Sequence, residues 1–508
     1  MKTVRSLAIT ALVVMSTIGA FSAEAAPSGQ ITWGVHISLA PTWFDPAETS
    51  GSITSFMVLY ALHDAMVKPM PGNQLTPSLA ESWSASADGL LYDFVLRRGV
   101  RFHNGDPVTA EDVKFSFERY RGSSSKLIKD RVTAIEIPEP GRVRFRLKQP
   151  WPDFMTYGNA TGAGWIVPKK YVDTVGEDGF RKTPVGAGPY KFVSFTPGVE
   201  MVLEASDQYW RKSPSVKRLV LKVIPDEATR LVALKRGEVD VSYVIRGALA
   251  EELRRSPGLV LKHTPVNATF WVNFLDQWDP KSPWHDRRVR LAASQAVNRQ
   301  AYNQAELLGL GRLSGSIIPS AFDFYWPAPA PTYNPSGAKQ LLAQAGYPNG
   351  FDAGEFFCDM TFTGPESVVN DLRAVGIGVK LRPLERAAFL KAFAEKKFKN
   401  LMYANSAVFG NAATRIESFV ASGGTYVYGS YPDIDGLFRE QTEELDRKRR
   451  EATLHRIQQL MHDKVMFGTL WEPSIIVSVA ARVEESGLGL IAGYPYSAPY
   501  EEVKLKSR

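Results

Sequence analysis

The sequence predicts an α/β protein in which parallel βαβ units follow a small antiparallel α+β unit. Between about residues 75 and 150, short strands of alternating apolar residues are separated by turn signals such as Asn104-Gly105. Farther along, a strand at residues 219–223, a helix that begins at Asp226 and a strand at residues 239–244 follow one another. That order is typical of a βαβ unit and therefore of a parallel sheet.

The elements of the first half can be assigned in chain order. Residues 31–35 predict a first strand. Apolar residues at helical spacing predict a helix that Ser52 opens and that reaches Met66. Thr109, followed three residues later by an aspartate, predicts a capped helix start. A hairpin is predicted around residues 138–141, because two alternating apolar runs flank a Pro-Glu-Pro-Gly turn.

A second α/β region begins near residue 265. It contains an arginine-rich helix at residues 289–296 and another helix at residues 338–342. Near the end of the chain, an amphipathic helix through residues 454–461 precedes apolar strands that extend to Val479. No internal repeat and no low-complexity tract interrupts this order.

The composition indicates a globular protein and excludes several classes of site. The chain has 508 residues, of which 44% are hydrophobic and 22% are charged, and its length suggests roughly three domains. The single cysteine, Cys358, excludes a disulfide framework and a cysteine-based metal site. The formal net charge of +7 is too small to indicate a nucleic-acid partner, which requires a concentrated basic face.

The first 25 residues have the pattern of a secretory signal peptide. Lys2 and Arg5 precede a mostly apolar stretch at residues 7–21, and Ala23-Glu24-Ala25 forms a cleavage site. A membrane anchor is a weaker interpretation, because a span needs about 20 apolar residues. No cysteine lies at the cleavage site, so a lipoprotein is not expected. We therefore expect an exported, periplasmic protein that begins after Ala25.

Motifs for catalysis are absent from the sequence. It contains no phosphate loop, no G-x-S-x-G elbow and no H-E-x-x-H pair. His455 and His462 are seven residues apart, about 10 Å along a helix, which is too far for both to bind one metal ion. We expect no enzyme activity, no metal site and no cofactor.

Several segments together resemble one family of transport proteins. They are residues 75–83, 96–105, 109–119, 184–192 and 334–348. The sequence resembles the family 5 extracellular solute-binding proteins of ABC importers, the peptide/nickel type that includes dipeptide- and oligopeptide-binding proteins.

The resemblance implies a periplasmic binding protein-like fold of two lobes with a hinge cleft and an extra α+β domain inserted in the first lobe. The implied divisions are residues 1–25 for the signal peptide, 26–50 plus 183–265 plus 475–508 for the first lobe, 51–182 for the inserted domain and 266–474 for the second lobe. The two crossovers between the lobes are expected near residues 266–274 and 469–475.

The implied function is capture of a peptide or peptide-like solute in the cleft, closure of the lobes by a hinge motion, and delivery to a membrane permease. The expected partners are the solute and the ABC permease subunits in the inner membrane with their cytoplasmic ATPase, and the protein is expected to be a monomer. One alternative is the same role for a non-peptide solute, such as an anionic opine-like, aromatic or metal-chelate compound. An exported hydrolase is a less favoured alternative.

Five residues are candidates for contact with the solute, because they lie in or near the expected crossovers or in the segment after Tyr403. They are Trp271, Asn405, Phe409, Arg415 and Trp471. Peptide-binding members of the family carry an acidic residue in the segment matching 403–411, and this chain has none there. Asn405 can bond an amine without supplying a counter-charge, whereas Arg415 favours an acidic group.

Overall fold

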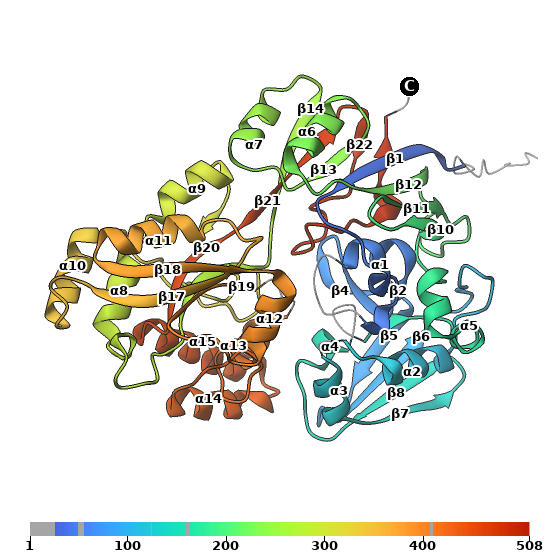
Figure 1. Ribbon diagram of the computed structural model, residues 1–508. Helices are drawn as coiled ribbons and strands as arrows, with labels where there is room; N and C mark the ends of the chain where they lie inside the picture. Colours follow the sequence, from blue (N-terminus) through green and yellow to red (C-terminus); the bar gives the residue numbers. More distant parts are fainter. Residues whose placement is uncertain (1–25, 49–54, 123, 159–162, 407–409, 507–508) are drawn as a thin grey trace, which may run out of the picture.

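The structure is a computed structural model that describes residues 26–48, 55–122, 124–158, 163–406 and 410–506. Three larger sheets organise these residues, and they have seven, six and four strands. Figure 1 shows the six-stranded sheet with its helices in one half of the molecule and the other two sheets in the opposite half. We call the part built on the seven-stranded sheet the first lobe, the part built on the six-stranded sheet the second lobe, and the four-stranded part the insert. The predicted α/β class and its two-lobe arrangement are confirmed.

The seven-stranded sheet has the chain's first strand near its centre. In spatial order its strands are β10 (Tyr190–Thr196), β11 (Glu200–Ala205), β12 (Val216–Val223), β1 (Ser28–Val35), β13 (Val241–Tyr243), β21 (Ser474–Ala480) and β14 (Leu259–Pro265). The helices α6 (Glu227–Lys235) and α7 (Gly247–Arg254) belong to this lobe. Asp226 caps α6, since its side chain accepts from the Thr229 N–H. The predicted βαβ unit of β12, α6 and β13 is confirmed, with β1 parallel to both strands and between them.

The insert is an antiparallel sheet covered by helices. Its sheet has the order β5 (Ala80–Ala85), β6 (Leu91–Leu96), β8 (Arg142–Leu147) and β7 (Val132–Glu139). The chain between β1 and β10 also contains α1 (Phe56–Leu62), β2 (Asp64–Ala65), β3 (Val67–Met70), β4 (Asn73–Pro77), α2 (Ala110–Arg119), α3 (Ser125–Arg131), α4 (Phe154–Tyr157), β9 (Trp165–Ile166) and α5 (Lys169–Lys182). Helix α1 packs in the core of the first lobe rather than in that of the four-stranded sheet. The capping box predicted at Thr109 is present: Thr109 and Asp112 bond each other's backbone N–H groups at the start of α2.

The prediction that the first helix reaches Met66 is wrong. Helix α1 ends at Leu62, and Met66 lies between β2 and β3; Ser52 is outside the described residues. Every residue of α1 is buried, so the apolar pattern does not mark where the helix ends. The helix ends where His63 turns to extended backbone and the next two residues, Asp64 and Ala65, pair with Ile166 and Trp165 of β9.

The second lobe packs helices on both faces of its sheet. The strand order is β16 (Arg312–Leu313), β20 (Phe467–Glu472), β15 (Thr269–Phe274), β19 (Leu401–Ser406), β17 (Phe351–Asp359) and β18 (Ile377–Leu384). The helices are α8 (Arg287–Ala296), α9 (Arg299–Leu307), α10 (Pro335–Gln344), α11 (Pro365–Ala374), α12 (Arg386–Ala394), α13 (Ala412–Phe419), α14 (Pro432–Thr442) and α15 (Arg447–Asp463). Trp471 belongs to the core on one face and Trp271 to the core on the other. The short pair β22 (Val483–Glu485) and β23 (Lys504–Leu505) follows β21.

The chain passes between the two large sheets at two places. Strand β14 ends at Pro265 in the first lobe, and β15 begins at Thr269 in the second. Strand β20 ends at Glu472 in the second lobe, and β21 begins at Ser474 in the first. The domain boundaries stated in the sequence analysis stay predictions, because sheet membership alone does not delimit a domain.

Two glycines let the segment before β10 approach the end of α1 closely. A Cβ on Gly186 would lie 1.9 Å from the Leu62 carbonyl oxygen, and one on Gly188 would lie 2.5 Å from the Ala61 carbonyl oxygen. No side chain fits at such distances, so glycine is required at both positions. This contact explains the glycines in the motif at residues 184–192.

Asp64 is a buried carboxylate that joins the insert to the first lobe. It pairs with Lys68 at 2.8 Å and accepts hydrogen bonds from the Ser78 hydroxyl at 2.5 Å and the Trp210 indole at 2.7 Å. Burial opposes ionisation of Asp64, but Lys68 and Arg211 outweigh it and hold the pKa of Asp64 below its ordinary value.

We predict that Asp64→Asn destabilises the protein strongly. The change leaves Lys68, which is 1% exposed, without a carboxylate partner, and breaking a buried pair costs about 3–5 kcal/mol. Urea unfolding measures the loss. The matched control is Asp93→Asn, which breaks the half-buried pair with Arg144 and should cost about 1 kcal/mol or less. Equal small losses in both variants would contradict the prediction.

A second prediction concerns acid stability. Burial lowers the pKa of His63 to about 4, so the folded protein keeps this ring neutral. The unfolded chain takes up the proton first, near pH 6.5, so stability is complete above that pH and is lost as the pH falls to about 4. His63→Gln should reduce the loss of unfolding free energy over this range by about 3 kcal/mol. His462→Gln on α15 is the control, and an unchanged pH profile for His63→Gln would refute the expectation.

Candidate functional site

The insert and the second lobe touch through polar side chains away from the crossovers. Asp153 of the insert accepts a hydrogen bond from Arg450 Nη2 at 2.5 Å and from Asn411 Nδ2 at 2.6 Å. Arg131 of α3 pairs with Glu417 of α13 at 3.2 Å. Arg450 and Asp153 have exposed side-chain fractions of only 5% and 10%. We call these five residues the inter-lobe latch, because they form a second connection between the two halves of the molecule, apart from the crossovers.

Asn411 belongs to the latch because of its place at a helix end. Its side-chain oxygen accepts from the Thr414 N–H and caps α13, which leaves its Nδ2 group to donate to Asp153. The N-terminal end of α13 therefore lies at the boundary between the lobes.

A cationic cluster brings residues of both lobes together around His36. The His36 ring, just after β1, lies 5.0 Å from the Tyr496 ring centroid. Burial, with the charges of Arg230, Arg246 and Arg386, lowers the pKa of His36 to about 3. Arg386 begins α12 of the second lobe, whereas the other residues belong to the first. We call these five residues the His36 cluster.

The His36 cluster has an excess of positive charge. Arg246 pairs with Glu227 at 3.4 Å and Arg386 with Asp359 at 3.1 Å. Arg230 instead donates to four backbone carbonyls, which supply no counter-charge. His36 Nδ1 has no hydrogen-bond partner in the described part of the chain. A neutral imidazole beside guanidinium groups suits a polar or anionic ligand group.

The sequence analysis did not identify the His36 cluster. Its members are far apart in the chain, and each stands in an unremarkable local pattern. Only pairing of distant strands and contact between the lobes bring them together, so no local signal could have revealed the site.

The predicted contact residues within the described ranges lie on both faces of the second-lobe sheet. Strand pairing places Trp271 beside Ala404, on the sheet face that α13 covers. Asn405 and Trp471 both pair with Phe270 and therefore lie on the opposite face. Phe409 lies outside the described residues. The role of these residues in binding stays a prediction.

Three of the predicted residues are held by contacts within the second lobe. Trp471 stacks on Tyr302, with ring centroids 4.0 Å apart, and is 1% exposed. The Asn405 amide donates a long bond of 3.4 Å to the Thr269 carbonyl. Arg415 is 2% exposed, and burial lowers its pKa to about 9.

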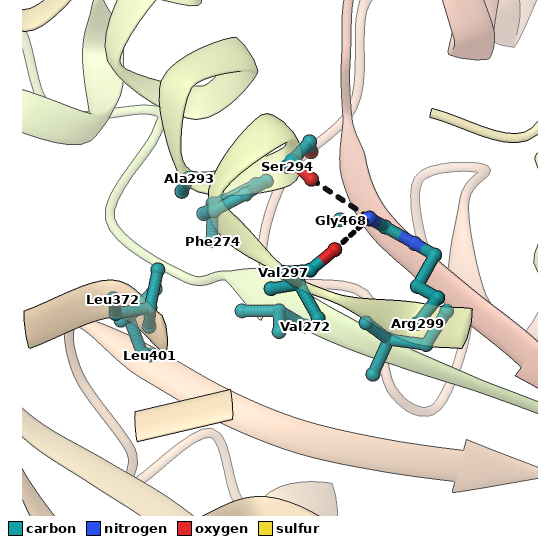
Figure 2. A pocket seen from close by; sticks show the side chains of 10 residues that line it. Val272, Phe274, Ala293, Ser294, Val297, Arg299, Leu372, Leu401 and Gly468 are labelled. Carbon is teal, nitrogen blue, oxygen red and sulfur yellow. Dashed lines mark hydrogen bonds between the residues drawn. The ribbon is translucent and has the colours of Figure 1, made fainter. Parts of the chain in front are cut away.

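The second lobe contains a small internal cavity that belongs to its packing and not to a binding site. Figure 2 shows it between strands and α8, with Arg299 as its charged side chain. Its volume is about 10 Å³, which is room for roughly one water molecule. Arg299 already donates to the carbonyls of Ser294, Val297 and Thr469. The cavity is far too small for a solute.

A larger pocket of about 550 Å³ lies on the insert, where α2 and α5 begin. Its charged groups are largely committed to one another. Asp112 caps α2 and accepts from the Lys169 N–H, and Lys169 pairs with Asp173. We interpret this pocket as a solvated surface of the insert.

Within the described ranges, no helix is both long and apolar enough to cross a bilayer. The same residues contain no cluster of three His, Cys, Asp or Glu side chains that could hold a metal ion.

Comparison with known proteins identifies similar chains. The family model of the bacterial extracellular solute-binding proteins, family 5 Middle, matches residues 74–426. Di/tripeptide-binding protein 2 of Pseudomonas aeruginosa (strain UCBPP-PA14) is 28% identical over 417 residues, covering 73% of this chain and 76% of that protein.

Solved structures have the same fold. The periplasmic binding protein DppA from Helicobacter pylori, in complex with the peptide STSA, matches with a TM-score of 0.79 at 24% identity, over 94% of this chain and 98% of that one. The binding protein MoaA from A. tumefaciens R10, in complex with mannopinic acid, matches with a TM-score of 0.77 at 24% identity, over 95% of this chain and 100% of that one.

We predict that Asp153→Asn shifts the protein toward an open arrangement of the lobes. The change leaves the buried guanidinium of Arg450 without a carboxylate, which should cost the closed form about 3–5 kcal/mol. Small-angle X-ray scattering should show a larger radius of gyration than for the wild type. Asp130→Asn, which breaks an exposed pair within α3, is the control and should leave the scattering unchanged. Identical curves for Asp153→Asn and wild type would exclude a role of the latch in closure.

Proposed function

The chain belongs to the bacterial extracellular solute-binding proteins of family 5, and on that premise we propose that it captures a peptide or peptide-like solute between its two lobes. The observation that supports this proposal most directly is the His36 cluster, in which the charge of Arg386 in the second lobe acts on the buried His36 ring of the first. A solute bound there would contact both lobes at once, so its binding would favour the closed form.

The proposed mechanism is a cycle of capture, closure and delivery. The crossovers at residues 265–269 and 472–474 are short, which suits a hinge about which two rigid lobes rotate. Closure forms the inter-lobe latch, and the closed form delivers its solute to ABC permease subunits in the inner membrane. The proposal includes a periplasmic location, removal of residues 1–25 and action as a monomer.

A transport role is favoured over catalysis. The similar proteins reported above are named as binding proteins, and the sequence lacks the motifs of common hydrolases. Turnover of a bound compound by the purified protein would refute the transport role.

A non-peptide solute is the second candidate. The family resemblance implies an acid in the segment that matches residues 403–411, this chain has none there, and the His36 cluster is cationic. Both observations favour an anionic group on the solute, and the similar protein MoaA is described with mannopinic acid. Mass spectrometry of compounds retained by the purified protein, followed by thermal shift with peptides and opines, separates the two candidates. A solute present at 100 times its dissociation constant should add about 2.7 kcal/mol of stability.

We predict that Arg386→Gln weakens binding of the retained solute. Glutamine keeps a donor for Asp359 but removes the positive charge, and loss of a charge-assisted hydrogen bond should raise Kd roughly 10-fold or more. Calorimetric titration measures the change. Arg382→Gln, four residues earlier in an exposed pair with Glu355, should leave Kd unchanged. An unchanged Kd for Arg386→Gln would place the solute elsewhere.

A further inference from the structure

Arg415 is a buried guanidinium group with most of its hydrogen-bonding capacity unused. Its Nη1 atom donates to the Ser406 carbonyl at 3.2 Å. Its Nε and Nη2 atoms have no partner among the residues that the structure describes. Two neighbouring polar atoms, Trp271 Nε1 and Ser406 Oγ, are also buried there without a described partner.

These polar atoms lie in one layer of the second lobe. Ser406 pairs with Thr269, and Trp271 pairs with Ala404, so the side chains of Ser406 and Trp271 lie on one face of the sheet. The Phe419 ring of α13 is 5.4 Å from the Trp271 ring and 5.5 Å from the Arg415 guanidinium. We call Trp271, Ser406 and Arg415 the Arg415 pocket.

The Arg415 pocket presents donors and a positive charge without a counter-charge. Burial is the cause that lowers the pKa of Arg415, and no carboxylate opposes it. At a pKa of about 9 the group is still charged at neutral pH. An unpaired charge in a protein interior is costly, so a buried charge is normally compensated.

Two other buried arginines in this lobe, Arg290 and Arg299, are compensated by backbone carbonyls, whereas Arg450 is compensated by Asp153. Arg290 is also 2% exposed, but it donates to four carbonyls, those of Trp284, His285, Lys464 and Val465. Arg415 has one such bond. Because the protein supplies so few acceptors around Arg415, we infer that a bound group supplies the remaining ones.

The two free nitrogens of Arg415 have the geometry that binds a carboxylate. Nε and Nη2 point along one side of the guanidinium plane and form two parallel bonds with a carboxylate. The same two atoms of Arg144 bind both oxygens of Asp93 in this chain, at 2.9 and 3.0 Å. A carboxylate is therefore the group that satisfies Arg415 best.

The Arg415 pocket lies at the end of the sheet that faces the first lobe. Thr269, opposite Ser406, follows the first crossover directly. Asn411 caps the helix that carries Arg415 and is bonded to Asp153 across the lobes. Parting of the lobes would break that bond and expose the N-terminal end of this helix.

We propose that the Arg415 pocket binds a carboxylate group of the transported solute, so that the substrate class is restricted to solutes that carry a free carboxylate. This inference rests on the proposed solute-binding function. The solute's carboxylate accepts two parallel hydrogen bonds from Arg415 and supplies the missing negative charge.

The experiment compares solutes that differ in the carboxylate alone. Wild-type protein is incubated with a tripeptide library made without Asp and Glu, as free acids or as C-terminal amides. A third library of amides contains one Asp or Glu, and mannopinic acid is a non-peptide carboxylate. Retained compounds are identified by mass spectrometry, and their Kd values are measured by calorimetry. We expect retention of compounds with a carboxylate and at least roughly 30-fold weaker binding of the matching uncharged amides.

Arg415→Met provides the matched variant. It should lose roughly 30-fold or more in affinity for the retained carboxylate, while its melting temperature without solute stays unchanged or rises, because an uncompensated buried charge has been removed. The control is Arg290→Met, which should lower the melting temperature because four carbonyls lose their donor. Should Arg415→Met fail to fold, Arg415→Lys keeps the charge but not the two parallel bonds and should lose roughly 10-fold.

Three other outcomes would overturn the inference, and they can be told apart. Equal binding of acids and amides, or wild-type affinity in the folded Arg415 variants, rejects the pocket while the proposed function stands. Stabilisation of the wild type but not Arg415→Met by sodium chloride or acetate, with solute affinity unchanged, would show that a free anion occupies the pocket. Failure of every library and of mannopinic acid to bind the wild type would reject the proposed function together with the inference.

Discussion

The architecture depends on two adjacent places where the chain passes between its large sheets. Strands β14 and β21 pair in the first lobe, with Pro265 opposite Ser474. Their continuations β15 and β20 pair in the second lobe, with Phe270 opposite Trp471. The two crossovers therefore lie side by side, and each has few residues. Such a connection lets the lobes rotate with little change inside either core, because only a few backbone dihedrals must change.

Two groups of polar residues connect the halves of the molecule outside the crossovers. The latch joins the insert to α13 and α15, and in the His36 cluster the charge of Arg386 on α12 acts on His36 and Tyr496 of the first lobe. Neither group makes a complete site within one lobe. A solute that neutralises the cationic residues would add attraction between lobes that otherwise meet through a small number of side chains.

The buried arginines of the second lobe show how similar residues acquire different roles. Arg290 and Arg299 each donate hydrogen bonds to several backbone carbonyls and so stabilise segments outside regular secondary structure. Arg415 donates to one carbonyl, that of Ser406, and keeps unused donors near the hinge. Its surroundings, rather than its residue type, distinguish a structural arginine from a candidate binding residue.

Local patterns predicted the capping box at Thr109, the cap at Asp226, the βαβ order and the two-lobe family fold, because each depends on residues close in the chain or on motifs that maintain the fold. The end of α1 was not predictable in this way, since the residues that follow it pair with β9, about 100 residues later in the chain. The candidate contact residues near the crossovers were identified by position, but strand register assigns Trp271 and Trp471 to opposite faces. The His36 cluster was missed entirely. The sequence determines local structure, because caps and turns depend on neighbouring residues. A site between lobes forms only when strands that are far apart in the chain pair and bring their charged side chains together.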